Sequence, residues 1–181
     1  NGHTFTYSGN DVYSLCGFVE NSGTMTINGS GGTIVSDKVG LNSKEGVLNV
    51  NDATIKAHRI GIYNKATVLK LKNVKFDESC GIDIKLGENG IIDLSEYNGD
   101  PITIDIDYKI DDGKKHRISP KGVSRNDLNK INFVKNSDNL YTVDLRYDEE
   151  GQYIYLAKHV HKWNYVLDNS DESGKTIKGY C

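Results

Sequence analysis

Three lysines, a tyrosine and an aspartate are the residues of this 181-residue chain whose types and spacing suggest chemistry. Lys44, Lys65 and Lys85 follow one another about twenty residues apart, and Tyr63 and Asp83 each stand two places before a lysine. If the lysines stack as neighbours about 4.8 Å apart, their like charges repel, and a bound polyanion would relieve that repulsion. The row therefore predicts a binding strip for an acidic glycan. The alternative is a row of solvated surface lysines.

Catalysis would need more acidic residues than this row offers. The position two places before each lysine is occupied by Asn42, Tyr63 and Asp83, so only one of these residues is a carboxylate. Glycosidases use two carboxylates about 5 to 9.5 Å apart. Lyases would use calcium-binding carboxylates beside a basic group, and Asp83 with Lys65 or Lys85 supplies half of that set. We therefore assign no catalytic residue, and a polysaccharide lyase or hydrolase, or its remnant, is the alternative.

Metal and cofactor motifs are weak. His159 and His161 fall on one face of an expected strand, but two histidines are short of a four-ligand zinc site. An acidic run from Asp168 lacks the glutamate that ends a calcium-binding loop, and no glycine-rich phosphate loop is present. The sequence therefore predicts no metal and no cofactor.

The spacing of the lysines is the period of a repeat. Glycines mark the starts of successive copies at Gly17, Gly40, Gly61 and Gly81, which gives a period of about twenty to twenty-three residues. Within each copy apolar residues alternate with polar ones, as in strands with one buried face. The repeat therefore predicts the stacked turns of a β-solenoid.

Each turn is expected to contain three short strands, with equivalent residues stacked in columns. Polar positions of the second strand are expected to face outward, and asparagines to occupy the turns before the third strand. The first strand is expected to stack Cys16, Val39, Ile60 and Cys80, then Phe18, Leu41, Ile62 and Ile82. The second is expected to stack Met25, Leu48, Leu69 and Ile92, then Ile27, Val50, Leu71 and Leu94, with the outward row Thr26, Asn49, Lys70 and Asp93. The third is expected to stack Ile34, Ile55 and either Phe76 or Val74.

These columns define the predicted fold class. Each strand would pair with its equivalent one turn later, and such parallel crossovers are right-handed in nearly all known cases. We predict an all-β fold, a right-handed parallel β-helix of four to five turns, closed by a small α+β C-terminal cap. An antiparallel sandwich also shows many short strands with frequent turns and is the alternative.

The domain organisation follows from where the repeat begins and ends. Residues 1–16 are expected to form an N-terminal capping turn, in which Phe5 and Tyr7 match Met25 and Ile27. The parallel β-helix should span residues 17–100. A cap should span residues 101–158 and contain one hairpin and one short helix, with Ser124 as the N-cap of that short helix. Residues 159–181 are expected to start a following module or to form terminal strands.

The cysteines are expected to be free thiols. Cys16 and Cys80 would lie in one column three turns, or roughly 14 Å, apart at the inter-strand spacing. A disulfide needs Cα atoms closer than about 7 Å.

Composition excludes several partner classes. The net charge of −3 is too small for a nucleic-acid-binding surface, which requires a basic patch. No apolar run approaches membrane-spanning length. The chain is expected to be a monomer in isolation.

Several runs carry a resemblance to known proteins. The segments VENSGTMTINGSGGTI, GIYNKA and GDPITIDI, followed by YTVDLRYDEEGQYIYL, resemble the pectate-lyase-like right-handed β-helix regions of large secreted surface proteins from Gram-positive bacteria. This resemblance implies an extracellular or cell-surface setting and brings no catalytic residues. We therefore expect a non-catalytic module for adhesion, display or spacing that binds a glycan or a host surface protein, with a structural stalk in a tandem array as a further alternative.

Overall fold

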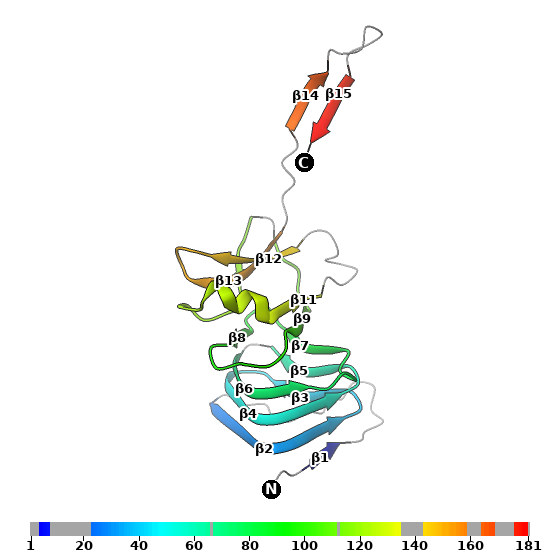
Figure 1. Cartoon of the computed structure of the whole chain (residues 1–181), viewed down its shortest axis with the longest axis vertical. Coiled ribbons are helices and arrows are strands. Elements are labelled where there is room, and N and C mark those ends of the chain that lie inside the picture. The colour runs from blue at the N-terminus through cyan, green and yellow to red at the C-terminus, as the bar shows by residue number, and fades with distance from the viewer. Residues whose placement is uncertain are drawn as a thin grey trace.

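The computed structural model describes residues 4–7, 23–65, 67–111, 113–134, 143–158, 164–168 and 176–180. Two parallel five-stranded sheets stack into a β-solenoid of about four turns, confirming the predicted fold class (Figure 1). The right-handedness stays a prediction. Sheet A runs in the order β1 (Thr4–Tyr7), β2 (Thr24–Ser36), β4 (Gly46–Ala57), β6 (Thr67–Phe76) and β8 (Ile91–Asp93). Sheet B runs in the order β11 (Ile131–Phe133), β9 (Ile102–Ile106), β7 (Ile82–Leu86), β5 (Ile60–Asn64) and β3 (Val39–Ser43).

Sheet A bends around a corner of the solenoid. The second and third strands expected in each turn are joined into one long strand, so β2, β4 and β6 contain 13, 12 and 10 residues. At the bend, Ser30, Asp52 and Asn73 have φ values of 49°, 50° and 49°. Among non-glycine residues, asparagine and aspartate are enriched in this conformation. The bend therefore turns the strand toward the next face without interrupting sheet A.

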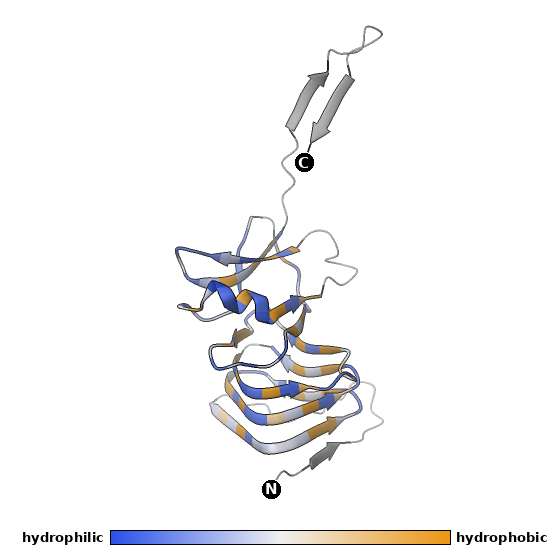
Figure 2. Ribbon diagram, in the orientation of Figure 1, coloured by the Kyte–Doolittle hydropathy of each residue, from blue (hydrophilic) through white to orange (hydrophobic). Residues whose placement is uncertain are grey.

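The predicted columns of sheet A are confirmed where the structure gives the pairing. Met25 pairs with Leu48, Leu48 with Leu69, and Leu69 with Ile92. Figure 2 shows hydrophobic and hydrophilic residues alternating along these strands. The inward side chains of Val50, Leu69 and Ile55 are each 0% exposed. Burying one such side chain stabilises the fold by about 1.5–3 kcal/mol. Other confirmed pairs are Ile27 with Val50, Val50 with Leu71, Ile34 with Ile55, and Ile55 with Phe76.

The predicted register of sheet B is wrong after β5. Val39 pairs with Ile60, 21 residues on, but Ile60 pairs with Ile82, which is 22 residues on, and not with Cys80. The extra length lies in a tight turn before β7, where the Cys80 amide donates to the Asp77 carbonyl at 2.9 Å. Cys80 is thus a half-buried free thiol at a turn, outside the predicted column. Cys16 and Phe18 lie outside the described residues.

The predicted register of the N-terminal strand is also wrong. Phe5 pairs with Ile34 and Tyr7 with Ser36, so β1 lies along the second half of β2 and not beside Met25 and Ile27. Both halves of β2 alternate with a period of two residues, and that period alone cannot distinguish them.

The C-terminal part extends and then covers the stack. Strands β9 and β11 continue sheet B, so the solenoid sheet reaches past residue 100. The predicted short helix is present as η1 (Arg125–Lys130), a 3₁₀ helix whose N-cap Ser124 and N3 residue Asp127 form a reciprocal capping box. The predicted hairpin is β12 (Val143–Asp148) with β13 (Tyr153–Lys158), and β10 (His116–Arg117) pairs along its other edge.

This cap shares the solenoid core. Buried Ile118, Ile154 and Leu156 belong to the same hydrophobic cluster as Leu69 and Ile92. The Ile92 amide also donates to the Ile118 carbonyl at 2.8 Å, so the cap uses a hydrogen-bonding group at the upper edge of sheet A. Strands β14 (Asn164–Asp168) and β15 (Thr176–Tyr180) pair with each other in antiparallel fashion.

Candidate functional site

The structure separates Lys85 from the other two predicted lysines. Lys65 lies beside Lys44, because its amide donates to the Ser43 carbonyl at 2.9 Å. Lys85, however, pairs with Tyr63, and the next residue of that row is Asp105. The predicted three-lysine ladder is therefore wrong. The cause is the longer turn before β7, which moves Lys85 two positions away from the Lys65 row.

The outer face of sheet B carries compensated charges. Lys85 Nζ lies 3.3 Å from Asp105 Oδ2. The Tyr63 hydroxyl donates to Asp107, and Lys65 Nζ lies 5.1 Å from the centre of the Tyr63 ring. Burial, and then the bond to Asp107, raise the pKa of Tyr63. Asp105 and Asp107 thus lie among these residues, so the face is not the unbroken row of positive charge on which the acidic-glycan prediction depended.

Asp83 lies in a different setting from these lysines. It belongs to what we call the corner row, in which Gly40, Gly61, Asp83 and Thr103 succeed one another across sheet B. The Asp83 amide donates to Thr103 Oγ1 at 2.8 Å, and the Thr103 amide donates to Asp83 Oδ2 at 2.7 Å. Burial raises the pKa of Asp83, and these contacts with Thr103 partly offset that rise. Asp83 and Lys85 therefore have separate partners and do not form the expected half of a lyase site.

A polar groove on the outer face of sheet A was missed by sequence reasoning. It has a volume of about 360 Å³, and we call it the sheet-A groove. Strands β2, β4, β6 and β8 contribute its floor, and the chain after β8 contributes Ser95 and Glu96. The outward row of the second strand was correctly predicted, but nothing in its pattern indicated that Ser95 and Glu96 would rise beside it. The groove is lined by Thr26, Asn49, Asn51, Lys70, Leu71, Lys72, Asp93, Ser95 and Glu96.

Two rows of paired polar side chains run through this groove. In the first row Asn49 Nδ2 donates to Thr26 Oγ1 at 3.0 Å, and Lys70 Nζ lies 3.9 Å from Asp93.

In the second row Asn51 Nδ2 donates to Asn28 Oδ1 at 2.8 Å, and Lys72 Nζ lies 2.8 Å from Glu96 Oε2. The bond to Glu96 raises the pKa of Lys72. Along the stack each row thus presents an amide, then a lysine, then a carboxylate. Such a surface is suited to a ligand that both donates and accepts hydrogen bonds.

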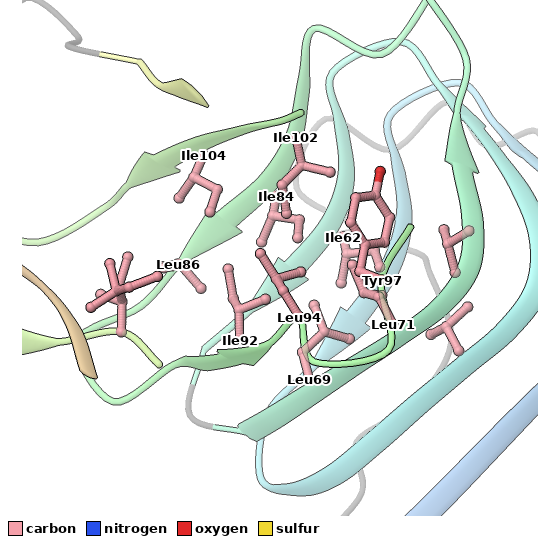
Figure 3. Packing of buried hydrophobic residues seen from close by; sticks show 14 of the residues in the cluster. Ile62, Leu69, Leu71, Ile84, Leu86, Ile92, Leu94, Tyr97, Ile102 and Ile104 are labelled. Atoms are coloured by element: carbon pink, nitrogen blue, oxygen red, sulfur yellow. The ribbon is translucent and has the colours of Figure 1, made fainter. Parts of the chain in front are cut away.

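A second hollow, which we call the corner cavity, opens where the repeat breaks. After β8 the chain forms a loop over residues 94–101 in place of the second half of a sheet A strand. Tyr97 from this loop is 4% exposed, and its hydroxyl donates to the Asp100 carbonyl at 2.7 Å. Figure 3 shows its ring among the inward-facing residues of the stack. The cavity measures about 440 Å³ and is lined by Val74, Lys75, Phe76, Asp83, Tyr97, Asn98, Gly99, Asp100, Pro101 and Ile102.

Comparison of the chain with protein-family models, with curated proteins and with solved structures gives no match. Within the described ranges no cluster of three or more histidine, cysteine, aspartate or glutamate side chains is arranged to hold a metal ion. His159 and His161 lie outside those ranges. No helix in the described part of the chain has the length and apolar character needed to cross a membrane.

Proposed function

We propose that this chain is a non-catalytic binding module of a secreted or cell-surface protein, and that the sheet-A groove holds a segment of a polysaccharide. The observation that carries the proposal is the pair of polar rows in that groove. Successive side chains of a row are about 4.8 Å apart along the stack, so a linear polymer lying along the rows would meet a new polar group at each turn. The extracellular setting rests on the resemblance of the repeats.

The charges in the groove specify the class of glycan. Lys70 and Lys72 lie opposite Asp93 and Glu96, so each positive charge has a negative neighbour. Such a surface does not attract a polyanion, whereas hydroxyl groups can donate to the carboxylates and accept from the amides. The groove therefore favours a neutral, hydroxyl-rich glycan, in place of the acidic glycan expected from the lysine row.

The test is a glycan array followed by calorimetric titration of the best ligand. Replacing both Asn49 and Asn51 with alanine removes one polar group from each row. We expect the affinity to fall by about 5- to 150-fold, because two hydrogen bonds contribute about 1–3 kcal/mol together and tenfold corresponds to about 1.4 kcal/mol. Lys65→Gln, on the outer face of sheet B, is the control and should bind as wild type does.

The outcomes separate the competing functions. Binding that changes little between low and physiological salt supports hydroxyl recognition in the groove. Equal binding by the double variant and the wild type would remove the groove from the site. Degradation of the bound polysaccharide would favour the enzyme alternative, and no binding to any glycan would favour a structural stalk.

A further inference from the structure

We propose that the corner cavity is a second ligand site, separate from the sheet-A groove, for a primary ammonium group carried on an apolar stem. Its volume of about 440 Å³ falls within the range of small-molecule sites, which is about 300–1,000 Å³. The cavity lies at the corner between the end of β6, strand β7 and the loop over residues 94–101. Its residues offer an apolar wall and a carboxylate.

The apolar wall fits a hydrocarbon stem. Pro101 on this wall is exposed and Phe76 is half-buried, so a ligand can touch both, whereas the core residues Val74 and Ile102, 0% and 1% exposed, support the wall from inside. Phe76 adds an aromatic ring, and the loop supplies the ring of Tyr97. A cation beside the face of an aromatic ring gains about 0.5–2 kcal/mol, so the half-buried Phe76 ring favours an ammonium group over a neutral one.

Among the described residues no lysine, arginine or histidine is paired with the Asp83 carboxylate. Asp83 is half-buried, and in the described part of the chain its hydrogen-bond partner is Thr103 alone. A carboxylate has about four acceptor positions, so Thr103 leaves room for a further donor. Burying a charge without a partner is unfavourable, and a bound ammonium ion would supply the missing partner.

The surrounding charges favour a cation as well. The pKa of Tyr97 is raised to about 12, first by burial and then by the negative charges of Asp83 and Asp100. Tyr97 therefore experiences a net negative potential at the cavity wall. Lys75 on the rim carries the opposing charge, and because it is exposed, solvent weakens its effect without removing it.

The direct test titrates the full chain with n-pentylammonium and, as a neutral match, with 1-pentanol, while amide chemical shifts are recorded. We expect saturable shifts at residues 97–103 with pentylammonium and at least about tenfold weaker binding of pentanol, since tenfold is about 1.4 kcal/mol. Asp83→Asn keeps the shape and removes the charge, and should weaken pentylammonium binding by about tenfold or more. The matched control, Asp107→Asn on the outer face of sheet B, should bind as wild type does.

A second variant keeps the proposal testable if Asp83→Asn does not fold. Lys75 is exposed, so Lys75→Gln should fold and should strengthen pentylammonium binding about two- to threefold by removing a like charge. Equal affinity for pentanol and pentylammonium would overturn the proposal. So would unchanged binding in Asp83→Asn or in Lys75→Gln, or shifts confined to other parts of the chain.

The source of the ammonium group is distinguished by a further probe. An acetylated and amidated Gly-Lys-Gly peptide presents the same group on a lysine side chain. Binding of the peptide at least as tight as that of pentylammonium indicates a protein ligand, and binding of pentylammonium alone indicates a free amine. Both results support the assignment of the cavity, whereas binding of neither probe contradicts it.

Discussion

The lower turns of the solenoid, residues 39–76, and the upper turn, residues 77–106, differ in the corner row. In the lower turns this row holds Gly40 and Gly61, and an added Cβ at Gly61 would lie 2.6 Å from the Asp83 carbonyl oxygen and 2.8 Å from the Phe76 ring. In the upper turn the same position holds Asp83, and a loop carrying Tyr97 takes the place of half a strand. The lower turns are thus filled at the corner, whereas the upper turn is hollow there.

This difference shows where a repeat protein can place a binding site. Each lower turn must match the turns above and below it, so its corner has room for glycine only. Above the upper turn β9 continues sheet B, but the second half of the sheet A strand is replaced by the loop over residues 94–101, so a side chain can replace hydrogen there. The four predictions below test this comparison, from the largest expected effect to the smallest.

Gly61→Asp places the residue of the upper turn into a lower turn. Because the new Cβ would meet a backbone oxygen and a ring, and the charge would be buried, we expect the free energy of unfolding to fall by at least about 3 kcal/mol. Urea denaturation measures this change. Gly113→Asn is the control: its φ is +74° and an added Cβ would meet nothing within 4 Å, so the loss should stay below about 1 kcal/mol. A loss of similar size in both variants would show that the corner is not crowded.

Two core isoleucines test whether the lower and upper turns unfold together. Ile62 in the lower turns and Ile104 in the upper turn are both 0% exposed. Alanine at either position should cost about 2–5 kcal/mol, and a single cooperative transition should remain in both variants. Calorimetry would report it. Two separate transitions in Ile104→Ala would mean that the upper turn and the cap form a unit of their own.

Tyr97→Phe tests the loop that closes the corner cavity. Losing the hydrogen bond to the Asp100 carbonyl should cost about 1 kcal/mol and speed amide exchange across residues 94–101. Tyr147→Phe removes an equivalent bond to the Val123 carbonyl, 2.8 Å long, in the cap. It should cost a similar amount but leave exchange in the loop unchanged. Faster loop exchange in both variants would argue against an independent loop.

The pH dependence of stability separates Asp83 from an aspartate of the cap. Burial raises the pKa of Asp83, so its charged form opposes folding, and this penalty appears as pH rises through the raised pKa. Asp83→Asn should therefore be slightly more stable than wild type at pH 7, and the difference should vanish below the unfolded pKa of about 3.9. Denaturation curves between pH 3 and pH 7 measure it.

Asp148 should give the opposite sign. Bonds from Lys115 and from the Gly151 amide lower its pKa to about 2. The charged Asp148 carboxylate therefore stabilises the fold above its unfolded pKa, and this stabilisation is lost as pH falls toward about 2. Asp148→Asn should accordingly be less stable than wild type at pH 7. A change of stability in the same direction for Asp83→Asn and Asp148→Asn at pH 7 would contradict the environments assigned to the two aspartates.

The sequence predicted the parts of the fold that depend on alternation. The Met25, Leu48, Leu69 and Ile92 column follows from period and polarity alone, and so does the outward row that floors the groove. The position of Cys80 did not follow, because the turn at Asp77 is two residues longer than the predicted register allows, which shifts the later rows of sheet B. That turn is fixed by local hydrogen bonds, which leave no periodic signal.

The two hollows were less predictable. The wall residues Ser95 and Glu96 and the ring of Tyr97 come from a segment without periodicity, whose path depends on packing against the stack. The sequence singled out Asp83 as the one carboxylate of a predicted row with Asn42 and Tyr63. Its assignment to the lysine face was wrong, because it follows the corner row and contacts Thr103.

The parallel stacking of equal turns has a consequence for how such a gene can change. A lower turn such as residues 39–59 contacts chiefly the turns beside it, so duplicating or deleting that stretch would leave every remaining row with a matching neighbour. The upper turn cannot be copied in this way without copying the corner cavity and its Tyr97 loop. Related sequences should therefore differ in length by whole turns inserted or deleted before residue 77. The corner cavity should keep the same position relative to the cap in all of them.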